Sequence, residues 1–332
     1  MPGVQDLWAI QGDDADFAAN LTQNELSHRR ISLFYCNTIN NIELLTGVRV
    51  NGILDLRVEA DVSRSGGAKL TRSAAGEEEA RRADPLMVTS VEKAFRVLSV
   101  FGKGHDTLSL SQVAQLSGMD VSSCQRFTHT LAKIGLLKKD PATKRFELTA
   151  RTLDLGYNFL SGQRLVQLAM PYLLHLSKET EETVNLTQLD DTDIIFVSRF
   201  VSRHMLNTDV IVGTRMPAYC TAPGIALLSR LPEQEAIAIL DRSNLAAHTP
   251  HTTWKRDDLI AKIRLAAKQG YATAFEEFYI GDASVAAAIL DAKGRPQAAV
   301  NVAVSCMRYA RDEIAPRFAP IVVATAHAMS QG

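Results

Sequence analysis

The sequence predicts an α+β protein in which a small winged helix-turn-helix unit precedes a mixed domain of helices and an antiparallel sheet. Two observations support this fold class. Between residues 87 and 150, three helical patterns precede a short hairpin pattern, which is the element order of a winged helix-turn-helix. After residue 179, hairpin patterns alternate with helical patterns. A chain of 332 residues is long enough to bury two separate cores.

The composition is that of an ordinary soluble protein, with 46% hydrophobic and 22% charged residues. No apolar run approaches the roughly 18 residues that cross a bilayer, and the first residues lack the order of a secretory signal. The cysteines are far apart and form no CxxC pair; they are Cys36, Cys124, Cys220 and Cys306. We therefore expect a cytoplasmic protein with reduced thiols and no membrane partner.

Residues 1–86 do not resemble a folded domain. The stretch 63–85 (SRSGGAKLTRSAAGEEEARRADP) is small, charged and turn-rich, which is typical of a linker or a disordered tail. Met87 stands directly before the first convincing helical pattern. We expect residues 1–86 to be either a poorly ordered extension or translated sequence upstream of the natural start.

The first unit contains three helical patterns with clear ends. The first, TSVEKAFRVLSVF, has Ser90 available as its N-cap. In the second, Ser109 and Gln112 form a capping box, and Gly118 follows where a helix should stop. Asp120 precedes the third pattern, VSSCQRFTHTLAKI, as its cap. The apolar residues expected in the core are Val91, Ala94, Leu98, Phe101, Phe127, Leu131 and Ile134.

The third helical pattern carries short polar side chains and an arginine in its opening turns. It leads into a hairpin, LLKKDPATKRFELT, that carries four more basic residues. Within 87–151, ten basic side chains stand against five acidic ones, so this segment is +5 and its flanks together are −6. This asymmetry indicates a module that binds a polyanion, although a solvated basic face explains the charge alone equally well.

The remaining elements build the mixed domain. Residues 152–178 predict helices with leucine faces, and two strands follow around a turn at 190–193. A loop then leads into a helix, and an amphipathic helix ends at Gly270. A hairpin of small apolar residues turns at Lys293–Gly294 before the last helix, which spans roughly 312–330.

Four stretches resemble the IclR family of bacterial transcriptional regulators; they are SVEKAFRVLSVF, LSLSQVAQLSGMDVSSCQRFTHTLAKIGLL, GTRMPAYCTAPGIALLS and KQGYATAFEEFYIGDASVAAAILDAKGRPQAAVNV. They occur in the family's order and spacing over residues 88–330, and PAYCT is most similar to members that regulate aromatic-acid catabolism. The resemblance implies a DNA-binding domain at 87–150, linker helices at 151–178 and a GAF-like α/β effector domain at 179–330. It also implies a nucleoid-associated regulator that forms homodimers pairing into homotetramers, with double-stranded operator DNA and a small organic acid as partners.

Residue chemistry supports a DNA-contacting role for the third helix. The opening turns of the second helix of a helix-turn-helix meet base edges in the major groove. Arg126 suits guanine, Gln125 suits adenine, and the neighbouring hydroxyls suit phosphates or bases. The candidate residues on this helix are Ser122, Ser123, Gln125, Arg126 and His129, and those on the hairpin are Lys138, Lys139, Lys144 and Arg145. The alternative is a solvated amphipathic helix.

The family's effector-contacting positions fall on Met205, Thr208, Met216, Ala222, Pro223, Ser284, Asn301 and Ala303. Backbone N–H groups at the start of the helix after Pro223 would hold a carboxylate. Ser284 and Asn301 would hydrogen-bond an acid or a phenol, and the methionines would supply an apolar wall. Ala274 and Ala283 depart from the aspartate and arginine of other members, which leaves the effector class open. Alternatively, these side chains simply pack the sheet.

Other functions are less well supported by the residues. Cys124 and Cys220 lack a histidine-and-acid context, so buried structural thiols are expected. His248 and His251 offer two metal ligands without a third, and we expect neither metal nor cofactor. A small-molecule hydrolase or isomerase using the C-terminal domain would convert its ligand rather than only bind it. A structural nucleoid protein would bind DNA without operator preference.

Overall fold

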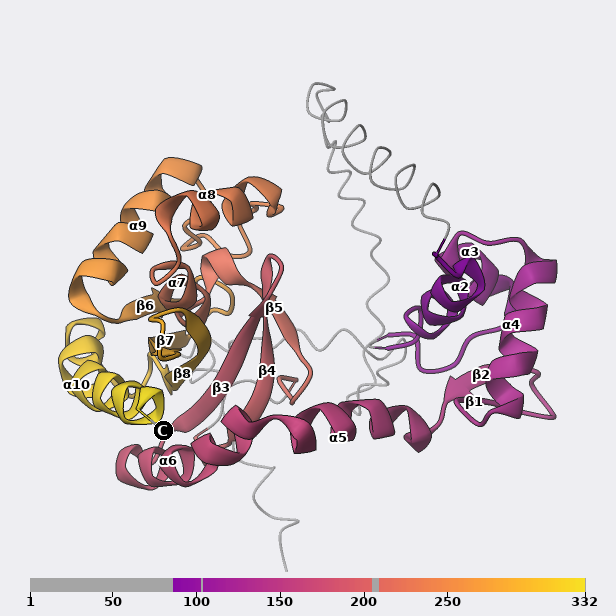
Figure 1. Ribbon diagram of the computed structural model, residues 1–332, viewed down its shortest axis with the longest axis horizontal. Helices are drawn as coiled ribbons and strands as arrows, with labels where there is room; N and C mark the ends of the chain where they lie inside the picture. Colours follow the sequence, from indigo (N-terminus) through magenta and orange to yellow (C-terminus); the bar gives the residue numbers. More distant parts are fainter. Residues whose placement is uncertain (1–85, 103, 205–208, 332) are drawn as a thin grey trace, which may run out of the picture. The chain divides into compact units, whose positions relative to one another are not determined.

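The computed structural model describes residues 86–102, 104–204 and 209–331 (Figure 1). The predictions for residues 1–85 and for Met205 and Thr208 lie outside the described residues. In chain order the elements are α2 (Thr89–Leu98), α3 (Leu110–Ser117), α4 (Val121–Lys133), β1 (Leu137–Lys139), β2 (Phe146–Leu148), η1 (Ala150–Thr152), α5 (Leu153–Gly162), α6 (Arg164–Thr180), β3 (Thr183–Asp190), β4 (Asp193–Phe200), β5 (Arg215–Pro217), η2 (Ala218–Cys220), α7 (Ala222–Leu228), α8 (Glu233–Arg242), α9 (Arg256–Gln269), β6 (Ala272–Phe275), β7 (Asp282–Leu290), β8 (Pro296–Ser305) and α10 (Arg311–Ser330).

Helices α2, α3 and α4 and the hairpin β1–β2 enclose one small core, as predicted. The capping box is present, because the Ser109 hydroxyl accepts from the Gln112 N–H and the Gln112 side chain accepts from the Ser109 N–H. Gly118 closes α3 in the left-handed conformation with φ 65°. The Asp120 carboxylate accepts the Ser123 N–H at 2.7 Å and caps α4. These local signals are therefore confirmed.

Three predictions for this unit are wrong. Ser90 lies inside α2, whose N-cap is Val88 without a side-chain hydrogen bond. Val91 is 53% exposed and Val97 is the buried residue of α2. Ile134 is 50% exposed because it follows α4 as the C-cap, after the helix has ended.

The helical region before the sheet is two helices, since the chain is extended at Gln163 between α5 and α6. Helix α5 has no buried residue, whereas α6 buries Leu173 and Leu176. The leucine faces predicted for the whole region are therefore packed mainly in α6, while Leu160 of α5 is partly buried against the same cluster. Among the described residues, no helix is both long and apolar enough to span a membrane.

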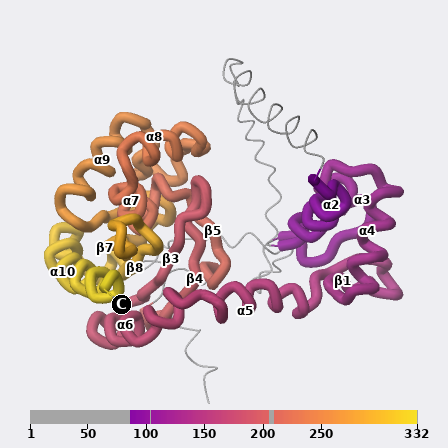
Figure 2. Tube along the Cα trace, viewed as in Figure 1, coloured from indigo at the N-terminus to yellow at the C-terminus, as the bar shows by residue number. Residues whose placement is uncertain are grey.

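Six strands form an antiparallel sheet in the order β5-β4-β3-β8-β7-β6. Helices α6 and α10 pack on one face, and α7, α8 and α9 cover the other (Figures 1 and 2). The predicted turns at 190–193 and 293–294 are confirmed, and Gly294 has a φ of 77°. The short edge strands β5 and β6 and helix α8 were not predicted.

A β-bulge interrupts the pairing of β3 with β4. Leu186 pairs with Ser198, whereas Thr187 pairs with Phe196, so Val197 is the additional residue of β4. Val197 packs in the core beneath α6 and α10, and Ser198 donates to the Met170 sulfur on α6. Two successive residues of β4 therefore face α6, and the alternation of faces changes after them.

Candidate functional site

The opening turns of α4 present a polar surface. Ser122, Gln125, Arg126 and His129 are exposed, and they line a shallow groove together with Lys139 of the hairpin. Ser123 lies on an adjacent part of the same helix, where hydrogen bonds from it hold the pKa of Asp120 below its usual range. Leu131 and Cys124 are buried on the opposite side. The helix is therefore oriented with its predicted DNA-contacting residues outward.

The hairpin residues have different surroundings. Lys138 pairs with Glu147 at 3.2 Å, and the Lys139 ammonium lies 5.2 Å from the centre of the Phe146 ring. Lys144 is exposed at the turn. Arg145 donates to the Thr107 hydroxyl at 3.1 Å and to the Thr107 carbonyl at 2.7 Å. Arg145 therefore holds the hairpin against the segment before α3, a role that the sequence analysis missed.

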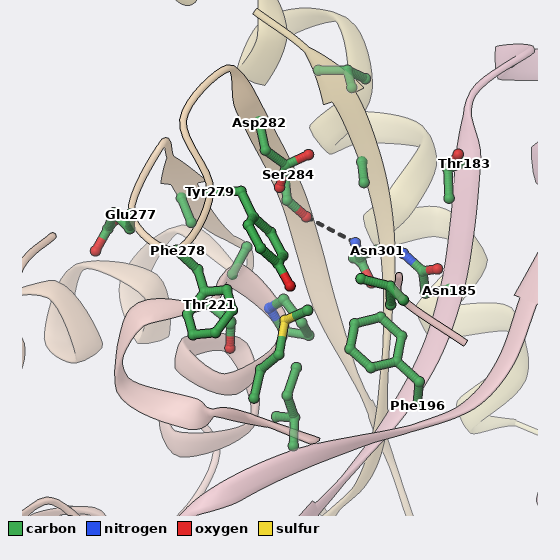
Figure 3. A pocket seen from close by; sticks show the side chains of 18 of the residues that line it. Thr183, Asn185, Phe196, Thr221, Glu277, Phe278, Tyr279, Asp282, Ser284 and Asn301 are labelled. Carbon is green, nitrogen blue, oxygen red and sulfur yellow. Dashed lines mark hydrogen bonds between the residues drawn. The ribbon is translucent and has the colours of Figure 1, made fainter. Parts of the chain in front are cut away.

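A pocket opens on the face of the large sheet that α7 covers, with an empty volume of about 730 Å³ that includes its opening. Six of the predicted effector-binding residues line it; they are Met216, Ala222, Pro223, Ser284, Asn301 and Ala303. Phe196, Phe278 and Tyr279 add aromatic walls (Figure 3). The structure therefore brings together residues from β5, α7, β7 and β8 that are far apart in the sequence.

Asn301 is the most constrained polar residue of the pocket. It is 3% exposed, and its amide nitrogen donates to the Ser284 hydroxyl at 2.8 Å (Figure 3). The Asn301 Oδ1 atom has no hydrogen-bond partner in the described part of the chain. A buried acceptor without a donor destabilises a fold by about 1–3 kcal/mol, so a donor from solvent or from a bound molecule would stabilise this atom.

The start of α7 offers little to an anion. The Gly224 N–H already donates to the Thr221 hydroxyl at 3.3 Å, and Pro223 has no N–H. Gly224 is required by packing, because a Cβ there would lie 2.1 Å from the Ala218 carbonyl oxygen. The backbone site that the sequence predicted at this helix is thus reduced to the amide of Ala222.

Four charged residues of the pocket were missed by the sequence analysis; they are Arg199, Glu276, Glu277 and Asp282. Arg199 lies on β4, and its guanidinium donates to the Asn185 side-chain oxygen at 3.0 Å. Burial lowers the Arg199 pKa, and the charge of Asp282 opposes that effect. Asp282 lies at the start of β7, where burial raises its pKa to about 7 although the positive charge of Arg199 lowers it. The pocket therefore holds a partly buried guanidinium and a carboxyl group whose pKa is raised to about 7.

The other candidate chemical groups have structural partners. The His248 ring is 2.9 Å from the Tyr219 hydroxyl and packs against Phe278, and His251 lies 3.7 Å from Glu276. Burial raises the pKa of the Cys220 thiol to about 12, which disfavours the nucleophilic thiolate. Within the described ranges, no three His, Cys, Asp or Glu side chains are grouped to hold a metal ion.

The comparisons with known proteins agree with this arrangement. A family model described as the C-terminal domain of the bacterial transcriptional regulator IclR matches residues 157–331, and one described as the IclR helix-turn-helix domain matches residues 90–141. The Pca regulon regulatory protein of Pseudomonas putida is 32% identical over 242 residues, which cover 73% of this chain and 82% of that protein.

Two crystal structures share the fold. One from Rhodococcus sp. RHA1 has a TM-score of 0.65 and 33% identity, and the match covers 74% of this chain and 98% of that chain. An IclR homologue from Microbacterium hydrocarbonoxydans, solved in complex with 4-hydroxybenzoate, has a TM-score of 0.61 and 19% identity over 73% of this chain and 98% of that chain. This chain therefore belongs to the IclR family of bacterial transcriptional regulators, with a helix-turn-helix DNA-binding domain and a C-terminal effector domain.

Proposed function

We propose that the chain binds operator DNA through the first turns of α4 and that a small organic acid bound in the pocket controls operator affinity. The observation that supports ligand binding in the pocket is the polarity of the pocket wall. Helices cover both faces of this sheet, a setting that favours apolar residues throughout, yet Asn185, Ser284 and Asn301 are buried polar residues on the pocket side. Such groups are retained where a ligand uses them.

The effector is proposed to be an aromatic acid. Phe196, Phe278 and Tyr279 give the pocket walls on which a ring can pack, and Met216 adds a polarisable side chain. The PAYCT stretch supports the same class, as do the relative named for the Pca regulon and the neighbour solved with 4-hydroxybenzoate. Binding without conversion would separate this sensor from the hydrolase or isomerase alternative.

In the proposed complex with operator DNA, Gln125 and Arg126 of α4 read bases. The contacts of Ser122, Ser123 and His129 are to bases or phosphates. Lys138, Lys139 and Lys144 supply sequence-independent attraction to phosphates. Arg145 contributes mainly by holding the hairpin in place through Thr107.

The test compares Arg126→Ala with Lys139→Ala by fluorescence anisotropy on operator and scrambled DNA at several salt concentrations. Arg126→Ala is expected to lose about 1–3 kcal/mol on the operator and to relax the preference at one base position. Lys139→Ala is expected to weaken binding to both DNAs and to reduce the salt dependence by about one unit of slope. Equal effects of the two changes on every sequence would contradict base reading by Arg126.

We propose that the chain controls DNA binding as an assembly of several copies. We propose the domain limits 87–150, 151–178 and 179–330, with homodimers that pair into tetramers. The exposed apolar side chains of α5 support a helix that a second copy covers, since Leu153 and Tyr157 are each 70% exposed. Two recognition helices would then lie about 34–36 Å apart, or a multiple of that spacing.

An effector changes DNA affinity only if it binds one arrangement of the dimer more tightly than another. The expected coupling is about 1–3 kcal/mol, or 5- to 150-fold in operator affinity. Asn301→Leu removes a ligand contact far along the chain from α4, so it should abolish the ligand response and keep ligand-free DNA binding. Gel shifts with and without ligand test this expectation, and a normal response in the variant would move the effector site elsewhere.

A further inference from the structure

The β-bulge in β4 decides which side chain reaches the pocket. With regular alternation, residues 194, 196, 198 and 200 would share the pocket face, and Arg199 would point towards α6. The additional residue Val197 shifts the pairing of β4 with β3 by one residue, so that Arg199 becomes the register partner of Asn185. Arg199 lines the pocket as a result. Bulges that redirect a side chain are typical of functional sites.

Arg199 is the positive charge best placed to meet a ligand anion. Of the described residues that line the pocket, Arg199 and His204 are the two that can be cationic, and His204 is exposed, with its ring nitrogen accepting from Arg203. The Arg199 guanidinium is oriented by its 3.0 Å hydrogen bond to Asn185. Its charge influences Asp282, which lies across β3 and β8 in the same sheet, so its field extends through the pocket.

A second polar group that a ligand can bind, the side-chain oxygen of Asn301, lies on β8, two strands from Arg199 on β4. Asn185 and Asn301 are register partners on β3 and β8, and Asn301 Oδ1 is the buried acceptor that has no donor among the described residues (Figure 3). The Cα atoms of β4 and β8 are about 10 Å apart at two strand spacings. A small ligand that binds both Arg199 and Asn301 Oδ1 therefore has an anionic group at one end and a hydrogen-bond donor at the other.

We infer that Arg199 anchors the acid group of the effector and that the effector is a hydroxy- or amino-substituted acid whose donor binds Asn301 Oδ1. This inference rests on the proposed function, namely that the pocket binds an organic acid. It moves the acid away from the start of α7, where Thr221 and Pro223 leave little backbone N–H for an anion. The guanidinium instead offers charge-assisted hydrogen bonds to a carboxylate.

Calorimetry with three related probes tests both contacts on the full chain. The probes are 4-hydroxybenzoate, 4-hydroxybenzamide, which lacks the negative charge, and benzoate, which lacks the donor. Wild-type protein is expected to bind 4-hydroxybenzoate at least tenfold more tightly than either analogue. Arg199→Gln should remove the preference for acid over amide, and Arg199→Lys should restore part of it. Asn301→Leu should remove the preference for 4-hydroxybenzoate over benzoate and keep the preference for the acid.

Arg242→Gln on α8 is the matched control, because this exposed arginine pairs with Asp191 outside the pocket lining. It is expected to retain every preference. Circular dichroism checks that each variant is folded, and the comparison of the three probes on wild-type protein needs no variant. Equal wild-type affinity for acid and amide overturns the inference, and so does a wild-type protein that binds none of the probes.

Operator binding separates this inference from the proposed function. If 4-hydroxybenzoate binds with the expected dependence on Arg199 but leaves operator affinity unchanged, the anchor is supported and the proposed control of DNA binding is wrong. If an acid changes operator affinity equally in wild-type protein and in Arg199→Gln, control is supported and the anchor is overturned.

Discussion

The two faces of the central strands β3 and β8 have different compositions. On β3, Val184 and Leu186 point towards α6 and α10, whereas Asn185 and Thr187 lie on the other face. On β8 the first face carries Val300, Val302 and Val304, and the second carries Ala299, Asn301, Ala303 and Ser305. Both faces are covered by helices, so burial alone does not explain the difference.

The contrast separates what stabilises the fold from what recognises a ligand. Aliphatic side chains on the α6–α10 face gain free energy from burial, about 25 cal/mol per Å² of apolar surface. Buried polar side chains on the pocket face gain little unless they are hydrogen-bonded. Substitutions on the first face should therefore reduce stability, and substitutions on the pocket face should mainly change binding.

The largest expected effect is an exception to this division, because it is a loss of stability caused by a substitution on the pocket side. Gly224→Ala lies on the pocket side but should lose more than about 4 kcal/mol of stability or prevent folding, because its Cβ would overlap the Ala218 carbonyl at 2.1 Å. Urea unfolding followed by circular dichroism measures the change. A loss of less than 1 kcal/mol would mean that η2 moves away from α7 at little cost.

A smaller effect sharpens the comparison directly. Leu186→Ala on the α6–α10 face should lose about 2–5 kcal/mol, because it leaves a cavity in a fully buried cluster. Ser284→Ala on the pocket face should lose less, about 1–2 kcal/mol, since it removes one hydrogen bond and leaves the Asn301 amide nitrogen without that acceptor. Similar losses for the two variants, measured by denaturant unfolding without ligand, would contradict the proposed division between the faces.

The last expected effect, similar in size to that of Ser284→Ala, is a pH dependence on the pocket face. The pKa of Asp282 is raised from 3.8 to about 7, so the folded state retains a proton that the unfolded state has released. The stability from this group is complete below about pH 4 and is lost as the pH rises through 7. Between pH 5.5 and 7, the stability of wild-type protein relative to Asp282→Asn should fall by about 1–2 kcal/mol.

Thermal and urea unfolding of both proteins at matched pH values measure this difference. Arg199 is the charged group that lowers the Asp282 pKa, and Glu276, Tyr279 and Cys306 adjoin Asp282 on the neighbouring loops. A difference that stays constant with pH would show that Asp282 titrates at its ordinary value.

Much of the fold could be predicted because its signals are local. The Ser109–Gln112 capping box, Gly118 and the turn at Lys293–Gly294 each depend on residues a few positions apart. The exposure of Val91 and Ile134 and the short edge strands depend on packing between distant segments, which periodicity does not encode. The break at Gln163 directly follows Gly162, a helix-stop signal from which the sequence analysis drew no break.

The candidate site was predictable only in part. Met216, Ala222, Pro223, Ser284, Asn301 and Ala303 were identified through the family resemblance, and the structure brings them to one pocket. Arg199 and Asp282 were missed. In a regular strand, Arg199 would lie on the face opposite to that of Ile194 and Phe196, which is the face away from the pocket. The bulge at Val197 reverses this, and no sequence signal predicts the bulge.

The bulge also affects how homologous sequences should be compared. Side chains alternate between the two faces of a strand, so the face that each residue occupies depends on its position in the strand pairing. The charge of this pocket therefore depends on backbone pairing as well as on residue identity. A relative without the additional residue of β4 could align an arginine with Arg199 and still present it to the opposite layer. During evolution, one insertion or deletion in this strand can therefore change ligand preference while every residue that lines the pocket on β7 and β8 stays the same.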